Sequence, residues 1–185
     1  MPNGSLISCA ILMVAVVLLI AGYNRLVRKR QAVKSAWSQI DVQLKRRHDL
    51  IPNLVETVKG YIRHERETLE NVTKARAQAV DAGSLQDKAQ AENFLTQSLK
   101  SLFAVVERYP ELKANQNVLA LQEELASTEN RISFARQYYN DEVMRLNAMI
   151  QSVPTNAIAS LFAFRTEEFF AAEEDADRQV PQVKL

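Results

Sequence analysis

The chain has few of the residues that interrupt helices and none of the cysteine pairs that staple small domains. Its 185 residues include four glycines, five prolines and one cysteine, and aromatic residues make up 7% of the sequence. The single cysteine, Cys9, excludes an intramolecular disulfide. No alternation of Val, Ile and Thr between turn dipeptides occurs, so strands are not indicated. The abundant residues are good helix formers, and we therefore expect an all-α fold.

The chain also lacks a strong net charge. The formal value is +1 at pH 7, so no overall field would attract nucleic acid. Charge is nevertheless clustered, with a basic group at Arg25, Arg28, Lys29, Arg30 and Lys34 and an acidic group at Glu167, Glu168, Glu173, Glu174, Asp175 and Asp177. The basic group is best interpreted as a membrane flank. Nucleic-acid binding is the alternative, and the absence of interleaved aromatic residues disfavours it.

Charged residues are missing from Leu6 to Gly22, a run that as a helix would span roughly 26 Å. A cleaved signal peptide is the main alternative to an anchor, but it normally begins with basic residues, and Ile20-Ala21-Gly22 is a poor cleavage site. Cys9 lies inside this run, whereas a lipoprotein cysteine follows its apolar segment. Because the basic residues follow the run, we expect an uncleaved single-pass anchor, with its N-terminus outside and the rest of the chain in the cytoplasm.

A heptad seam follows the basic group and organises the rest of the chain. Its positions are Val33, Trp37, Ile40, Leu44, Arg47, Ile51, Leu54 and Val58, the pattern of a helix buried along one stripe against other helices. Arg47 is a charged residue in this seam, and Pro52 interrupts the helix without shifting its phase. We expect a kinked continuous helix here, with two helices separated near Asp49 as the alternative.

Further helical patterns complete a helical bundle. The first pattern continues from Ile62 to Asp81, where Gly83 suits a C-terminal cap and Ser84 with Asp87 forms a weak capping box. The next helices are expected over residues 85–108, over a long seam from Val118 to Val153 capped by Asn115 or Asn117, and over residues 156–170, folded back over one bundle end. The predicted organisation is an anchor at 1–23, a bundle at 24–172 and an acidic, disordered tail at 173–185.

The part of the chain after Gly22 resembles the LemA family. The resemblance rests on segments that include Ala36-Trp37-Ser38-Gln39-Ile40-Asp41, Arg47-His48-Asp49-Leu50-Ile51-Pro52-Asn53-Leu54, Glu107-Arg108-Tyr109-Pro110-Glu111-Leu112 and Thr128-Glu129-Asn130-Arg131-Ile132. It implies a bacterial protein with one N-terminal anchor and an up-and-down helical bundle. The resemblance supplies a fold and a location but no reaction, and His48 and the acidic C-terminal end are individual features of this chain.

No catalytic or metal-binding pattern is present in the sequence. Metal-carboxylate bundles use Glu-x-x-His motifs, and none occurs here. His48 and His64 are too far apart along the predicted first helix to share an ion. Glycine-rich phosphate loops, nucleophile elbows and zinc-protease motifs are also missing. We therefore predict no enzymatic activity, no cofactor, no metal and no small-molecule substrate.

Polar residues near the seams are the remaining candidates. A buried Arg47 or Glu65 needs a charged partner, for which Glu107, Glu129, Arg131 and Arg136 are available. An internal ion-pair network is one interpretation, and a polar surface for a partner protein is the other. Tyr109 is interpreted as a plug at one bundle end. The full candidate set is Arg47, Asn53, Glu65, Arg76, Glu107, Tyr109, Glu129, Asn130, Arg131, Arg136, Tyr139 and Asn140.

Together with the resemblance, these observations predict a non-enzymatic scaffold or self-assembling interaction module at the bacterial inner membrane. Its expected partners are the lipid bilayer and a second copy of the chain, a membrane protein, or both. An adaptor for a membrane protease or an envelope-stress system is the alternative.

Overall fold

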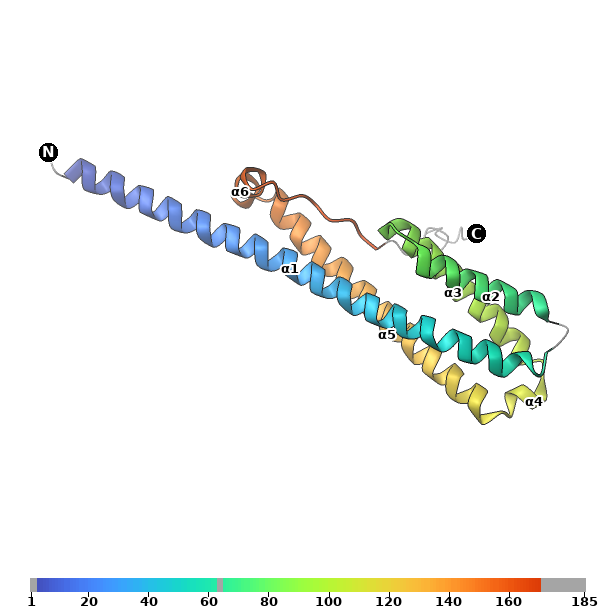
Figure 1. Ribbon diagram of the computed structural model, residues 1–185. Coiled ribbons are helices and arrows are strands. Elements are labelled where there is room, and N and C mark those ends of the chain that lie inside the picture. The colour runs from blue at the N-terminus through green and yellow to red at the C-terminus, as the bar shows by residue number, and fades with distance from the viewer. Residues whose placement is uncertain (1–2, 63–64, 171–185) are drawn as a thin grey trace, which may run out of the picture. The chain divides into compact units, whose positions relative to one another are not determined.

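A computed structural model describes residues 3–62 and 65–170 of the chain. Within these residues the secondary structure is helical, without strands, as predicted (Figure 1). The helices are α1 (Asn3–Lys59), α2 (Arg66–Asp81), α3 (Leu85–Val106), α4 (Pro110–Lys113), α5 (Gln116–Gln151) and α6 (Thr155–Leu161). The acidic tail predicted to be disordered lies outside the described residues, as does His64.

The chain divides into two compact units, to which α1 and α5 both contribute. The anchor unit comprises Met1–Ile40 and Ala135–Phe169, and the network unit comprises Asp41–Phe134 and Phe170–Leu185. In the part of the chain that the structure describes, α1 is the one helix long and apolar enough to cross a membrane. Its apolar side chains from Ile11 to Ile20 are exposed, which is expected of a segment that faces lipid.

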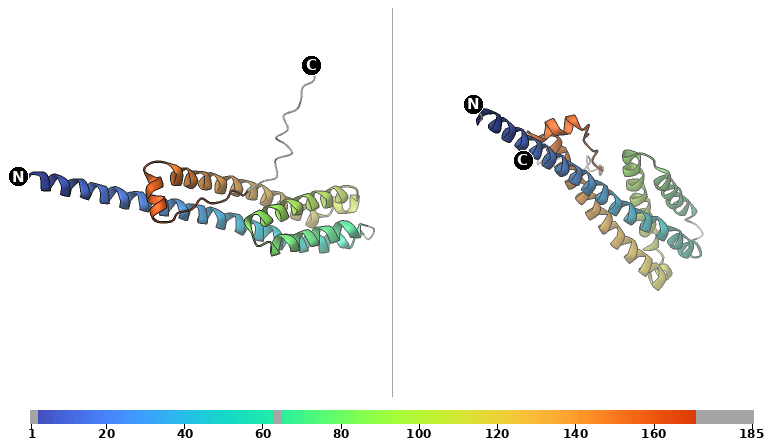
Figure 2. Two further views of the ribbon diagram at one scale, coloured as in Figure 1. Left: turned by 90° about the horizontal axis from the view of Figure 1, so that it is seen from above. Right: turned by 60° about the vertical axis from the view of Figure 1, so that its left-hand side comes forward.

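The network unit is an antiparallel bundle around one aliphatic core. The core joins Ile51, Leu54 and Val58 of α1 to side chains of α2, α3, α4 and α5. Figure 2 shows α2 and α3 running side by side in two further views. The seam prediction is confirmed, because every seam residue from Val33 to Val58 is buried except Trp37, which is half-buried.

The cap predictions for α3 and α5 are also confirmed. The Ser84 hydroxyl accepts a hydrogen bond from the Asp87 backbone N–H at 3.0 Å and donates one to the Asp87 carboxylate at 2.6 Å. Asn115 Oδ1 accepts from the backbone N–H groups of Asn117 and Val118, at 2.9 and 3.3 Å. Each cap satisfies amide groups that the first turn of a helix leaves unpaired. The predicted cap at Gly83 is wrong, since α2 ends at Asp81, the C-cap residue Ala82 is extended, and none of the described glycines has a positive φ.

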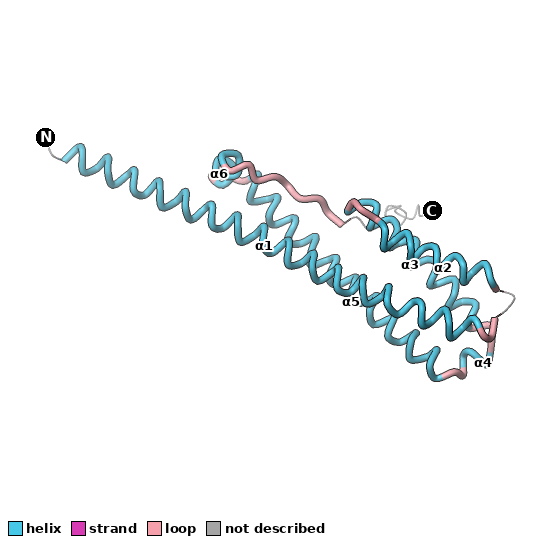
Figure 3. The backbone as a smooth tube through the Cα atoms, viewed as in Figure 1, coloured by secondary structure: helices cyan, strands magenta, loops and turns pink. Residues whose placement is uncertain are grey.

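Two helix boundaries differ from the prediction. The pattern expected to run on from Ile62 is interrupted, because α1 ends at Lys59 and α2 begins at Arg66. Gly60 is a poor helix former, and the backbone N–H groups of Tyr61 and Ile62 both donate hydrogen bonds to the Val58 carbonyl. The helix expected over residues 156–170 stops at Leu161, and Figure 3 shows the following residues as a loop.

The end of α6 has a local cause. The Phe164 N–H donates to the Ala159 carbonyl at 2.9 Å and the Ala163 N–H donates to the Ser160 carbonyl at 3.2 Å. Ala163 has a φ of 52°. These features form a Schellman motif, which closes a helix with one left-handed residue. Glycine normally occupies that position, so an alanine gave no signal in the sequence.

Candidate functional site

Arg47 is the centre of a buried polar network in the network unit. Its side chain is 0% exposed and forms ion pairs with Glu92 of α3 and Glu129 of α5. The guanidinium also donates to the Thr96 hydroxyl at 2.9 Å. A buried charge without partners is strongly destabilising, so these contacts explain how an arginine can occupy a heptad seam.

Glu92 links Arg47 to His48. The Glu92 side chain is fully buried, and the distance from His48 Nε2 to Glu92 Oε1 is 2.9 Å. Burial by itself raises the pKa of Glu92, but the hydrogen bond from His48 and the charge of Arg47 together lower it below the ordinary value. The carboxylate therefore stays ionised and accepts the proton of His48 Nε2.

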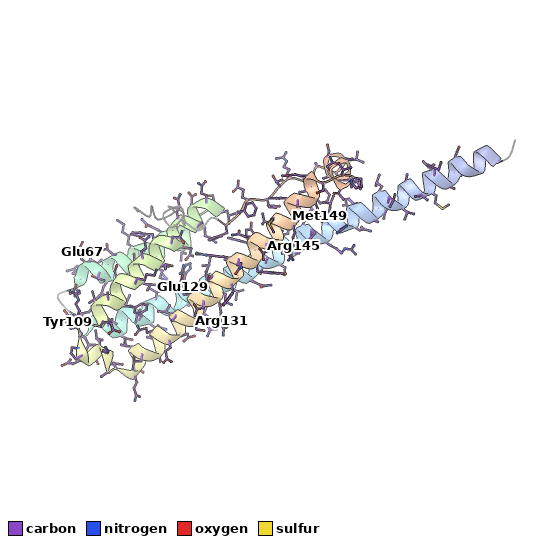
Figure 4. The ribbon with its side chains drawn as sticks, turned by 180° about the vertical axis from the view of Figure 1, so that it is seen from behind. Glu67, Tyr109, Glu129, Arg131, Arg145 and Met149 are labelled. Carbon is purple, nitrogen blue, oxygen red and sulfur yellow. The ribbon has the colours of Figure 1, made fainter. Side chains whose placement is uncertain are left out.

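Thr96 and Glu129 complete the network. The Thr96 hydroxyl lies 3.2 Å from Glu129 Oε1 and 3.1 Å from the Glu92 backbone carbonyl, and it accepts from Arg47. Glu129 is labelled in Figure 4, and its side chain is 38% exposed, so this end of the network reaches water. The network thus connects α1, α3 and α5 through one guanidinium.

A hydrogen bond from Arg76 satisfies the carbonyl that Pro52 leaves unpaired. Proline has no N–H to donate to the carbonyl four residues earlier, which is that of His48. Arg76 Nε of α2 donates to the His48 carbonyl at 2.6 Å. The helix remains continuous across Pro52, as we expected, and a side chain from a neighbouring helix replaces the missing intrahelical bond.

The anchor unit contains a second, more open ion-pair cluster. Lys29 of α1 pairs with Glu142 of α5 at 3.1 Å, and Arg145 pairs with the same carboxylate at 2.6 Å. Burial raises the pKa of Glu142, but the hydrogen bonds from Lys29 and Arg145 lower it overall.

Aromatic contacts lie beside this cluster. Tyr139 is buried against Trp37, with ring centroids 5.7 Å apart, and its hydroxyl donates to the Glu168 carbonyl at 3.0 Å. Burial, together with the charges of Glu167 and Glu168, raises the pKa of Tyr139. The tyrosine therefore stays neutral and acts as a hydrogen-bond donor.

The structure brings only some of the predicted residues together. Arg47 contacts Glu129, and Arg76 reaches the carbonyl of the residue next to Arg47. The others are dispersed: Asn53, Glu107, Asn130 and Arg131 are exposed, while Glu65, Tyr109, Arg136 and Asn140 are half-buried. Glu65 pairs with Arg108 at 3.2 Å and Glu107 with Lys113 at 2.9 Å. Tyr109, labelled in Figure 4, packs against the core of the network unit.

Glu92, His48 and Thr96 were missed. A signal for Glu92 existed in the sequence. Glu92 precedes Leu99 by one heptad and Val106 by two, so it occupies the same seam position as these residues and is a second charged seam residue. A charged residue in a buried seam needs an oppositely charged partner. This reasoning applies to Glu92 of α3 as it does to Arg47, and it would have paired the two residues. The roles of His48 and Thr96 depend on the packing of three helices, and no local pattern indicates them.

This arrangement pairs charged groups with one another inside the bundle. Among the residues that the structure describes, no three His, Cys, Asp or Glu side chains lie close enough to hold a metal ion. A groove of about 860 Å³ between the end of α1 and α2 is lined by residues such as Val55, Leu69 and Ala77, and the network residues are not among its lining. The contacts of Arg47, Glu92 and Glu129 are therefore suited to fixing helix register.

Comparisons with known proteins agree with the architecture. The LemA family model matches residues 36–185. Protein LemA of Metamycoplasma hominis is 27% identical over 155 residues, which cover 82% of this chain and 69% of that protein. Magnetosome protein MamQ 2 of Paramagnetospirillum magneticum is 23% identical over 188 residues, covering 88% and 69% respectively. Magnetosome protein MamQ of Magnetospirillum gryphiswaldense is 22% identical over 205 residues, covering 96% and 75%. Since the family model spans most of the sequence, including every residue of the buried network, the chain belongs to the LemA family.

Proposed function

We propose that the protein is a non-enzymatic scaffold or self-assembling interaction module of the bacterial inner membrane. A membrane location is supported by the apolar span of α1 and by the bacterial relatives. The basic residues that follow the span favour an outside N-terminus and a cytoplasmic bundle. The names of the relatives state no reaction, and the ionisable groups at the centre of the network unit are paired with one another.

The observation that carries the proposal is an exposed face of α5. Phe134 is 72% exposed, and Asn130 and Arg131, one turn earlier on the same helix, are also exposed. We call these three residues the α5 face. Aromatic and arginine side chains supply most of the binding energy in protein interfaces. An isolated exposed phenylalanine is common, but here it adjoins two residues that the sequence had marked as interaction candidates.

Glu129 and Arg131, which are two residues apart and therefore on opposite sides of α5, show how this helix divides its roles. Glu129 points into the network, where it contacts Arg47 and Thr96. Arg131 is exposed, and Figure 4 labels both positions on α5. One side of the helix is thus committed to folding, while the α5 face is available to a second copy of the chain or to a membrane protein.

The test is the mass of full-length protein in nanodiscs or detergent. We expect a defined oligomer, and we expect Phe134→Ser to dissociate it while Phe94→Ser does not. Phe94 is the matched control, because it is an exposed phenylalanine of the network unit, 46% exposed, on α3. An oligomer that survives Phe134→Ser excludes the α5 face as the contact. A monomer that also yields no partner on crosslinking contradicts the proposal, whereas a monomer that crosslinks to a membrane protease supports the adaptor alternative.

A further inference from the structure

The α5–α6 corner and α6 form an uncharged segment in an otherwise charged domain. No Asp, Glu, Lys, Arg or His lies between Arg145 and Arg165. Charged residues make up 24% of the chain as a whole, so this gap is unusual for a surface segment. We call residues 146–164 the uncharged corner.

Contacts within the anchor unit place α6 at the end of the apolar run. A Cβ atom added to Gly22 would lie only 2.4 Å from Ile158 Cδ1, so the Ile158 side chain of α6 rests directly on the Gly22 backbone. The Tyr23 ring lies 4.7 Å from that of Phe162 and 5.9 Å from that of Phe164. Figure 2 shows α6 beside α1 in a second view. Gly22 is the last residue of the apolar run Leu6–Gly22, so α6 lies level with the end of that run.

Apolar side chains of the uncharged corner face outward. Val153 is 82% exposed, Leu161 68% and Phe162 45%. The neighbouring residues of the apolar run are exposed to a similar degree, with Leu18 at 65% and Ile20 at 52%. Exposed apolar surface of this kind marks a partner or membrane contact. Here part of it belongs to α6 and its C-cap Phe162, which contact α1 at Gly22 and Tyr23, the end of the apolar run.

Basic and aromatic residues border this surface in the order found at a membrane interface. Arg25, the first charged residue after the run, is about 4.5 Å beyond Gly22 along the helix. The Arg30 guanidinium lies over the Phe164 ring, 5.0 Å from its centroid, and Arg165 follows directly in the sequence. Tyr23 and Phe162 lie at the level between the apolar and basic residues. Aromatic residues at the headgroup level with cations just outside them are typical of interfacial segments.

We propose that the uncharged corner is a second membrane contact, inserted into the interfacial region of the bilayer that α1 spans. Val153, Leu161 and Phe162 enter the headgroup–acyl boundary, while Arg25 and Arg165 meet the headgroups. Two contacts fix the tilt and height of the anchor unit, whereas a single helix would leave it free to rotate about its own axis. The partner is lipid, and the proposal does not depend on self-assembly or on the α5 face.

The test uses full-length protein in nanodiscs, with Cys9→Ser removing the native thiol. The environment-sensitive fluorophore NBD is attached at Leu161→Cys or, separately, at Val153→Cys. The matched control is Leu119→Cys, an exposed leucine of the network unit at 42%. We expect blue-shifted emission at Leu161→Cys and Val153→Cys, with most of it lost when the nanodisc contains lipids that carry a quencher near the headgroup. The NBD label at Leu119→Cys should emit at the wavelength that NBD has in water, and its intensity should not change when the quencher lipids are present.

Two results would overturn the proposal. One is emission at both corner positions that matches the Leu119→Cys control. The other is blue-shifted emission that lipid quenchers leave unchanged, because it would mean that a second copy or another protein covers the corner. Circular dichroism confirms that each labelled variant is folded.

A further variant tests the geometry directly. Gly22→Leu places a bulky side chain where Ile158 rests, so it should lift α6 and reduce quenching at Leu161→Cys. The control is a Gly22→Leu protein that keeps its native Cys9 and carries the label there. This label should remain quenched. Loss of quenching at both positions would mean that the anchor itself had left the membrane, and equal quenching at Leu161→Cys with and without Gly22→Leu would contradict the contact.

Discussion

The network unit and the anchor unit each contain an ion pair between α1 and a neighbouring helix, α3 in the network unit and α5 in the anchor unit, but the two pairs differ in how far water reaches them. In the network unit the Arg47 and Glu92 side chains are both 0% exposed. In the anchor unit Lys29 remains 31% exposed while its partner Glu142 is 4% exposed. Desolvating a pair of charges costs several kcal/mol per ion unless the partners match well. The buried network is therefore sensitive to the loss of any member, and the open cluster tolerates more change.

The largest expected effect is that of Arg47→Met, which leaves Glu92 buried without its main partner. We expect the free energy of unfolding to fall by about 3–5 kcal/mol, measured by denaturant titration of full-length protein in detergent. The adjacent Arg46→Met is the control, because its pair with Glu124 is 47% and 41% exposed and should contribute about 1 kcal/mol or less.

A compensating change distinguishes charge from packing at Arg47. Adding Glu92→Leu to Arg47→Met removes the stranded carboxylate, so most of the lost stability should return. If Arg47→Met is as stable as Arg46→Met, the network does not stabilise the fold. A stable Arg47→Met protein that has lost its oligomer would instead assign Arg47 to recognition.

Lys29→Met should have a smaller effect in the anchor unit. Glu142 keeps its contact with Arg145, so we expect a loss of about 1.5 kcal/mol, the low end for a hydrogen bond to a charged group. The same denaturant titration measures it, with Lys34→Met, an exposed lysine on α1, as the control near zero. A loss equal to that of Arg47→Met would remove the distinction between the units.

Acid should lower the stability of both units, because it protonates a paired glutamate in each of them. Glu92 and Glu142 have pKa values below the ordinary value in the folded protein. A depressed pKa contributes stability that is complete above the unfolded value, about 4.3 for glutamate, and is lost as the pH falls through the lower native value. Unfolding titrations from neutral pH to acid should therefore show stability falling below about pH 4.3. Glu92→Gln and Glu142→Gln should each flatten this decline, and an unchanged pH profile in both would contradict the assignment.

The sequence predicted the parts of each unit that depend on local pattern. The seam around Arg47 followed from heptad spacing, and the caps at Ser84 and Asn115 followed from residue type. Arg47 also had to have a partner, and Glu129 was among those considered. Three-dimensional packing decided the rest: His48 joins the network because its ring reaches α3.

The turn after Lys59 and the end of α6 lacked a strong local signal for a different reason. One glycine, Gly60, is often tolerated in a helix. Ala163 adopts a left-handed conformation for which alanine has no preference. In both places the sequence continues an apolar pattern after the helix has ended, so periodicity alone extends the helix too far.

The contact between Arg76 and the His48 carbonyl should be coupled to Pro52. We expect Arg76→Met to cost about 1 kcal/mol, since it removes the donor that replaces the missing proline N–H. In a Pro52→Ala background the carbonyl has an intrahelical donor, and Arg76→Met should cost less. A double-mutant cycle measures this coupling. Equal costs in the two backgrounds would show that Arg76 acts through packing alone.

The smallest expected effect is a gain in stability from Ala163→Gly in the anchor unit. A left-handed conformation costs an L-residue about 1–2 kcal/mol, and glycine avoids this cost. Glycine has more conformational freedom in the unfolded chain, however, and losing it on folding offsets roughly 0.5–1 kcal/mol of the gain. We therefore expect a net gain of up to about 1 kcal/mol by denaturant titration. The control is Ala157→Gly, at an exposed position inside α6, which should lose about as much. If both substitutions destabilise the protein, α6 does not end in a left-handed turn at Ala163, and the helix continues along the apolar pattern toward Phe170.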